Sequence, residues 1–360
     1  MKLFECQGCG QMLFFENVRC ERCGRQLGFL PERLTLSALD PAGEGRWRAL
    51  AGSRRLWRFC ANAQHGACNW LVPAGGKAEL CRACLLNRTI PNLEEPQHQV
   101  LWQRIEMAKH RLVYGLLRLG LPLPSKAEEP EKGLAFDFLA GTPQPGEDGP
   151  GVVTGHASGL ITLDIAEADP VQRERLRREL YEPYRTLLGH FRHEIGHYYW
   201  ERLIDDPGRH EEFRALFGDE RTDYGAALSA HYAQGPQPPT WQESFISSYA
   251  KAHPWEDFAE TWAHYLHIVD TLETGASFGL RIRPKAGRDR GLAVAIDFDP
   301  YREENLERMI QAWFPLTYAV NELNHSMDQP DLYPFILAPK VIEKLSFVHR
   351  LVHQDAAPRN

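Results

Sequence analysis

The sequence predicts an α+β chain in which a small cysteine-rich domain precedes a larger mixed domain. Two observations lead to this prediction. All eight cysteines of the 360 residues lie between Cys6 and Cys84, mostly in C-x-x-C pairs. After residue 126, short strand-like runs come before a long helix-like stretch that contains His193-Glu194-Ile195-Gly196-His197. The two parts therefore differ both in composition and in the chemistry that they offer.

The composition is that of an ordinary globular protein, with 43% hydrophobic and 25% charged residues. The net charge of −7 gives no electrostatic reason to expect a nucleic acid partner. The first residues lack the apolar segment of a signal peptide, and no run approaches the roughly 18 apolar residues of a membrane span. We therefore expect a cytoplasmic protein without a membrane partner, whose cysteines are reduced.

The first four cysteines form two copies of C-x-x-C-G, a pattern typical of a zinc ribbon. The predicted ligands of this structural zinc are Cys6, Cys9, Cys20 and Cys23. Two thiolates in one tight turn can bind the same ion, and the glycine after each pair accepts the positive φ that lets backbone amides approach the sulfurs. The alternative is four free, buried cysteines.

The other four cysteines are spaced less regularly. The predicted ligands of a second structural zinc are Cys60, Cys68, Cys81 and Cys84. His65 lies between the first two as a competing ligand. Closed tetrahedral sites have no open position for a substrate, so both ions would serve to fold the segment. This domain could also bind a protein partner.

Changes in composition divide the chain further. The predicted domains are a zinc-ribbon domain at 1–92, a helical connector at 93–125 and a larger domain at 126–360. The predicted strands of the larger domain are 134–139, 152–156 and 160–165. A helix is expected from Pro170, which follows a capping Asp169, to about residue 206, with a kink at Pro183. Beyond residue 301 we expect amphipathic helices, one of which ends before Pro315.

The motif His193 to His197 is the candidate catalytic metal site. At positions i and i+4 of a helix both histidines lie on one face, so both rings can reach one ion. Glu194 would lie beside that ion, where a general base holds water. The alternative is two surface histidines flanking a glutamate, but the composition allows only about 0.08 chance matches. Trp200 and Leu203 stand where the metzincin extension needs glycine and histidine, which excludes that class.

A third protein ligand must come from elsewhere in the chain. A helix-forming run that begins at Pro254 carries Glu256 and Glu260 at positions i and i+4, among apolar residues that indicate burial. One carboxylate can bind zinc while the other accepts the free N–H of a ligating histidine. The alternatives are a solvated acidic helix face, and His264 as the ligand in place of Glu256.

The two motifs together resemble the gluzincin metallopeptidases of the anthrax lethal-factor and Pro-Pro endopeptidase type. The resemblance implies Glu256 as the third zinc ligand. It also implies that Glu260 orients His193 or His197. Tyr249, seven residues before the ligand glutamate, corresponds to a tyrosine that stabilises the oxyanion. The likeness is confined to the two helices and this tyrosine.

Over its whole length the chain resembles a bacterial family of zinc-binding metallopeptidases that carry an N-terminal zinc-ribbon domain. The stretches that carry this resemblance are 60–69, 86–91, 193–197 and 253–267. The resemblance implies a zincin-like domain with a small mixed sheet and an active-site helix. We therefore expect one catalytic and two structural zinc ions, and hydrolysis of peptide bonds by Glu-assisted attack of zinc-held hydroxide. Two alternatives stay open: a protein-binding module with an inactive zincin scaffold, and a metallohydrolase acting on a non-peptide amide.

Overall fold

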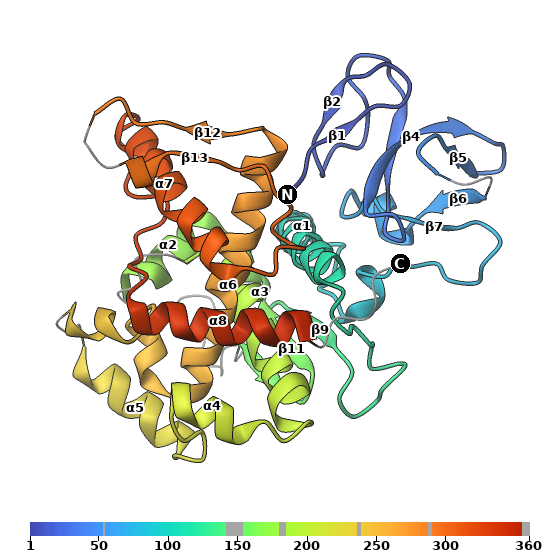
Figure 1. The fold of residues 1–360 in the computed structure, drawn as a ribbon. Coiled ribbons are helices and arrows are strands. Elements are labelled where there is room, and N and C mark those ends of the chain that lie inside the picture. Colours follow the sequence, from blue (N-terminus) through green and yellow to red (C-terminus); the bar gives the residue numbers. More distant parts are fainter. Residues whose placement is uncertain (53–54, 142–153, 180–184, 236–238, 287–289, 355–360) are drawn as a thin grey trace. The chain divides into compact units, whose positions relative to one another are not determined.

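The computed structural model describes residues 1–52, 55–141, 154–179, 185–235, 239–286 and 290–354 (Figure 1). The chain folds as two compact units. Unit 1 comprises Met1–Arg118 and Leu123–Arg173, and unit 2 comprises Leu119–Pro122 and Glu174–Asn360. Among the described residues, no helix combines the length and the apolar character that crossing a membrane requires.

The N-terminal part of unit 1 consists of antiparallel strands. These are β1 (Phe4–Glu5), β2 (Met12–Leu13), β3 (Gln26–Leu30), β4 (Thr35–Pro41), β5 (Trp47–Ala49), β6 (Leu56–Phe59) and β7 (Leu71–Pro73). β1 pairs with β2, and the others form one five-stranded sheet in chain order. Side chains from this sheet form a small core, made by Leu30, Leu39, Ala49, Trp57 and Leu71. Two short 3-10 turns also lie in this region: η1 (Ala61–His65) comes directly after Cys60, and η2 (Cys84–Leu86) begins at Cys84.

A helix and a mixed sheet complete unit 1. The helix α1 (Pro96–Leu119) lies within the predicted helical connector, and its Tyr114 ring centroid lies 5.4 Å from that of Phe15. The sheet has the order β10-β11-β9-β8 and contains β8 (Asn87–Thr89), β9 (Ala135–Leu139), β10 (Gly155–Ala157) and β11 (Leu160–Asp164). β9 pairs in parallel with both β8 and β11, whereas β10 is antiparallel. β8 belongs to the predicted zinc-ribbon domain and β9 to the predicted larger domain, so their pairing extends unit 1 across both predicted boundaries. The boundaries themselves stay predictions based on sequence alone.

Two of the three predicted strands, 134–139 and 160–165, correspond to β9 and β11. The third, 152–156, lies partly outside the described residues, and its described end begins β10. After β11 come a 3-10 turn η3 (Ile165–Ala168) and helix α2 (Pro170–Glu179).

Unit 2 is mainly helical. Its helices are α3 (Leu187–Trp200), α4 (His210–Phe217), α5 (Tyr224–Gln234), α6 (Pro254–Ser277), α7 (Leu306–His325) and α8 (Pro339–Gln354). Its shorter elements are η4 (Glu201–Asp205, a π-helical turn), η5 (Pro239–Glu243), η6 (Tyr249–Ala252), η7 (Arg290–Leu292) and the hairpin β12 (Arg281–Ile282) with β13 (Val294–Ala295). The longest described helix of this unit, α6, packs against α3, α7 and α8.

The prediction of one helix from 170 to about 206 is wrong. α2 ends at Glu179, and α3 starts only at Leu187. The backbone of Thr186 is extended, with φ −125° and ψ 153°, and its hydroxyl accepts the N–H of Gly189 at 3.0 Å. A side chain that satisfies a free N–H in this way marks a helix start. The predicted kink at Pro183 lies outside the described residues.

The prediction that a helix ends before Pro315 is also wrong, since α7 continues through this proline to His325. An internal proline costs a helix at least one backbone hydrogen bond. Here Trp313, Pro315 and Leu316 are all buried. Burial of one apolar helix face therefore outweighs the loss of that bond.

Candidate metal centre and active site

The helices α3 and α6 approach each other closely at Gly196, inside the histidine motif. A Cβ atom on Gly196 would lie 2.8 Å from the Cα of Ala259 on α6, and 3.2 Å from the Cβ of Trp262. One turn further on, the Tyr199 ring stacks on Trp262 with centroids 4.9 Å apart. The missing side chain at Gly196 thus lets the two helices pack with backbone almost in contact, which brings the carboxylates of α6 to the histidines of α3.

The start of α6 is held by a local cap and by an ion pair with another helix. His253 caps the helix, because its Nδ1 accepts the N–H of Trp255 at 3.1 Å, and Pro254 occupies the first helical position. In the first turn the buried Asp257 pairs with Lys344 of α8 at 2.6 Å. The same ammonium donates to the carbonyl of Ser244 at 2.7 Å. The first turn of α6, which carries Glu256, is therefore anchored from two sides.

Three side chains converge as the sequence predicts. His193 Nε2 lies 3.2 Å from His197 Nε2 and 3.0 Å from Glu256 Oε2, and His197 Nε2 lies 3.6 Å from the same oxygen. Ligands that surround a zinc ion tetrahedrally at about 2.0–2.1 Å are about 3.3 Å apart. The three atoms match this spacing, so His193, His197 and Glu256 fit a zinc ion.

The carboxylate of Glu256 uses its two oxygens differently. Oε1 accepts a hydrogen bond of 2.5 Å from the phenol of Tyr224, at the start of α5. Oε2 is buried and faces the two imidazoles, and among the described residues it has no hydrogen-bond donor other than these rings. A buried carboxylate oxygen without a donor is costly unless a cation or proton satisfies it. Oε2 is therefore the oxygen available to bind a metal, because the phenol of Tyr224 already donates to Oε1.

The second carboxylate of α6 orients one of the histidines. Glu260 Oε1 lies 2.7 Å from His193 Nδ1, while its Oε2 accepts a hydrogen bond of 2.6 Å from Ser247. Of the two histidines that Glu260 was predicted to orient, the contact is with His193. A carboxylate at Nδ1 fixes the tautomer and turns Nε2 toward a metal.

The candidate general base, Glu194, is buried on α3. Its Oε1 lies 3.1 Å from His190 Nε2, one helical turn earlier. Burial alone would raise the pKa of this carboxyl group. The hydrogen bond from His190 and the nearby imidazoles have the larger combined effect and lower its pKa to about 2. Glu194 is therefore ionised at neutral pH and able to accept a proton.

Tyr249, at the start of η6, lies beside the histidines. Its ring centroid is 5.8 Å from that of His193 and 5.8 Å from that of His231. Burial, reinforced by the negative charge of Glu256, raises its pKa above the ordinary tyrosine value. The phenol therefore stays protonated and can donate a hydrogen bond.

His264, the alternative third ligand, contacts Tyr333 and Phe335. Its Nδ1 is 2.8 Å from the hydroxyl of Tyr333, and its ring packs edge-on against Phe335 with centroids 4.3 Å apart. The group that the structure brings together at the metal centre contains Glu256 with the two motif histidines.

We expect metal binding at this centre to release a proton and to strengthen as the pH rises. Burial alone would lower the pKa of His193, but its hydrogen bonds to Glu256 and Glu260 raise it well above the ordinary value. Without metal the ring is thus protonated at neutral pH, whereas a metal needs a free Nε2. While one proton is displaced, affinity should rise roughly tenfold per pH unit. Calorimetry in buffers of different ionisation enthalpy, on protein with filled cysteine sites, measures this. Binding without proton release at pH 7 would contradict it.

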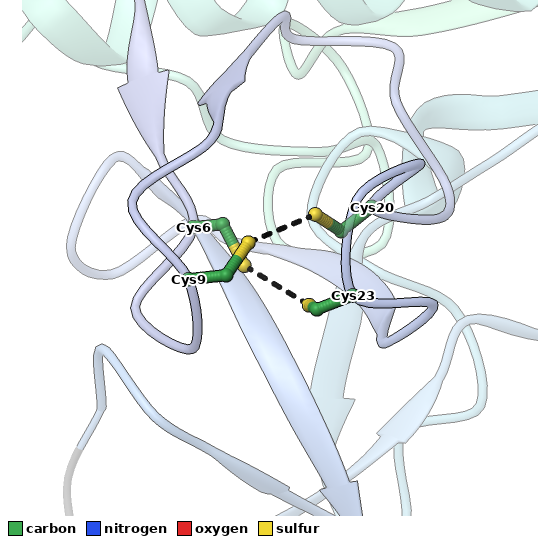
Figure 2. Close-up of side chains that lie close together, drawn as sticks. All are labelled: Cys6, Cys9, Cys20 and Cys23. Carbon is green, nitrogen blue, oxygen red and sulfur yellow. Dashed lines mark hydrogen bonds between the residues drawn. The ribbon is translucent and has the colours of Figure 1, made fainter.

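The first cysteine group closes as the zinc-ribbon pattern predicts (Figure 2). Cys6 Sγ lies 3.7 Å from Cys23 Sγ, and Cys9 Sγ lies 3.6 Å from Cys20 Sγ. Sulfurs around a tetrahedral zinc ion at about 2.3 Å are about 3.8 Å apart. The glycines after each pair, Gly10 and Gly24, have φ of 74° and 73°. This set of donors fits a structural zinc.

The second cysteine group is also assembled. The members Cys60, Cys68, Cys81 and Cys84 have sulfurs that all lie within 4.8 Å of one another. His65, the competing ligand of the sequence analysis, lies 3.0 Å from the Gln64 amide and packs on Trp102. The histidine that contacts these sulfurs is His110 of α1.

Residues that contact the sites without a signal in the sequence pattern include His110, Tyr224 and Ser247. His190 contacts Glu194, as its position four residues earlier in the same helix indicates. No spacing signal joins Tyr224 or Ser247 to the α6 carboxylates, because loops separate them.

Comparison with known proteins agrees with this geometry. Residues 98–351 match a family described as "Putative zinc-binding metallo-peptidase", and residues 3–95 match a zinc-ribbon domain. Uncharacterized proteins of Mycobacterium bovis and Mycobacterium tuberculosis are each 42% identical over 357 residues, which covers 99% of this chain and 96% of theirs. No solved structure matches the chain.

Proposed function

Because the chain belongs to this family of zinc-binding metallopeptidases, we propose that it is a gluzincin-type peptidase with Glu194 as its general base. The observation that carries the proposal is the triangle of His193 Nε2, His197 Nε2 and Glu256 Oε2, whose sides are 3.0–3.6 Å. Two imidazoles and one carboxylate are the ligand set of many catalytic zinc sites, which keep a fourth position open. The likeness to the lethal-factor type rests on the same residues.

The residues around the triangle supply the other functions that peptide hydrolysis needs. Zinc, when bound, supplies a Lewis acid that polarises a carbonyl and acidifies water. Glu194, ionised and oriented by His190, takes a proton from the attacking water and passes it to the leaving amine. Tyr249 stays protonated and donates a hydrogen bond to the developing oxyanion.

Tyr224 has a positioning role in this proposal. Its phenol occupies Glu256 Oε1, so the carboxylate presents a single oxygen to the metal. A one-oxygen ligand leaves more room around the ion for substrate than a two-oxygen ligand does. Ser247 also has a positioning role, because its hydroxyl donates to the carboxylate of Glu260, which orients His193.

The proposal includes three zinc ions, one catalytic and two structural. The structural ions would be held by the two cysteine groups. Peptides or proteins are the proposed substrates. A protein partner could bind the zinc-ribbon part.

Metal analysis combined with a peptide-library screen tests the proposal. We expect three zinc ions per chain, one of which a chelator removes readily. Peptide cleavage should stop when that ion is removed and resume when zinc is added back. Two tightly held ions and no cleavage would support a binding module instead. Three ions with the easily removed one in place, but no peptide cleaved, would point to another amide substrate.

A further inference from the structure

The second cysteine group has a candidate ligand beyond its four thiolates. Helix α1 passes the group and presents three buried polar side chains, Glu106, Lys109 and His110. Lys109 and Glu106 form an ion pair of 2.8 Å, so these two charges compensate each other. The imidazole of His110 is left facing the sulfurs.

The distances from His110 to the sulfurs match those between ligands of one metal. His110 Nε2 lies 3.3 Å from Cys68 Sγ, 3.6 Å from Cys84 Sγ and 3.9 Å from Cys81 Sγ. Around a tetrahedral zinc ion, with Zn–S about 2.3 Å and Zn–N about 2.0–2.1 Å, nitrogen and sulfur are about 3.6 Å apart. Cys68 Sγ and Cys81 Sγ are themselves 3.7 Å apart. The nitrogen therefore stands where a fourth ligand would.

The other ring nitrogen indicates which tautomer the neutral ring of His110 adopts. Nδ1 lies 2.6 Å from the backbone carbonyl of Glu106. A carbonyl can only accept, so Nδ1 carries a proton and donates it. In the neutral ring Nε2 then has a lone pair, directed at three sulfurs that also carry lone pairs. Ligating histidines commonly use this arrangement, with one nitrogen on a carbonyl and the other on the metal.

We propose that His110 is a ligand of the second metal site, and that Cys68, Cys81, Cys84 and His110 form a complete set around the ion. Cys60, whose sulfur accepts the N–H of Cys81 at 3.3 Å, is then an alternative fourth donor. The site gains a ligand from α1, within the stretch that matches the metallopeptidase family. Metal at this site would hold α1 against the cysteine-bearing loops.

Cadmium NMR on the full chain tests this, with the magnetic isotopes of cadmium and nitrogen introduced. In the unmodified protein we expect one cadmium signal from a cysteine site to be scalar-coupled to a histidine nitrogen. His110→Ala should remove that coupling and shift the signal toward the position of the first, all-sulfur site. His65→Ala, at the other histidine of this region, should leave it unchanged. If the only couplings come from His193 and His197, the proposal is wrong.

Two cysteine variants keep the test decisive even if His110→Ala does not fold. Cys60→Ser should retain its cadmium and the His110 coupling under a chelator, because three thiolates and the imidazole remain. Cys60→Ser combined with His110→Ala should lose one metal ion per chain. Loss of that ion from Cys60→Ser alone would show that Cys60 is required and would overturn the proposed ligand set.

Discussion

Replacing Glu194 by glutamine is expected to abolish peptide hydrolysis while the protein keeps its metal. Glutamine has nearly the same shape, but its amide cannot take a proton from water. General acid–base catalysis contributes about 10²–10⁴-fold in rate, so kcat should fall by at least that range. The metal should stay, because Glu194 is not part of the triangle of His193, His197 and Glu256. Turnover of a cleaved library peptide, measured beside zinc content, checks both expectations.

Tyr249→Phe is the matched control for that variant. It also keeps the metal ligands, and it removes one hydrogen bond to the oxyanion rather than the base. We expect a loss of about 10²–10³-fold in kcat. Normal hydrolysis by Glu194→Gln would reject the proposed mechanism, whereas loss of zinc would show that Glu194 supports the metal.

Replacing Gly196 by alanine should destabilise the protein and weaken the metal centre together. The new methyl group would meet the backbone of α6 at Ala259, 2.8 Å away, so one helix must move. Overpacking of this kind costs about 1–3 kcal/mol, and the higher helix propensity of alanine returns at most about 1 kcal/mol. Because α6 carries Glu256 and Glu260, its displacement also changes their distances to His193. Thermal unfolding and zinc affinity measure the two effects.

Gly225→Ala provides the control in the same unit. Gly225 lies in helix α5, where the nearest atom to a new Cβ is a side-chain oxygen of Asp223 at 3.6 Å. This substitution should stabilise the protein by about 0.5–1 kcal/mol, because alanine restricts the unfolded chain and favours helix. If both alanine variants were equally stable, close packing at Gly196 would not be what positions α6.

The sequence predicted the helix that carries the histidine motif, but it did not predict where that helix begins. The helix-favouring pattern continues from Pro170 onward, and Pro183 within it predicts a kink rather than a new helix start. The start of α3 depends on the extended backbone and capping hydroxyl of Thr186. The course of α7 through Pro315 also depends on packing. Burial of its apolar face in unit 2 outweighs the tendency of proline to end a helix. Local propensity gave way to packing in both places.

The sequence alone predicted the candidate metal-binding side chains, because their spacing is a property of the local backbone. A separation of four residues puts His193 and His197 on one helical face whatever surrounds the helix. The C-x-x-C-G pairs likewise carry their own turn geometry.

Only the tertiary structure decided which atoms meet across elements that loops separate. It selected Oε2 of Glu256 through the phenol of Tyr224, assigned Glu260 to His193, and placed His110 among the sulfurs of the second group. The physical reason is that such contacts depend on how closely two helices pack, as at Gly196 and Ala259. The spacing of residues along the sequence carries no information about that distance.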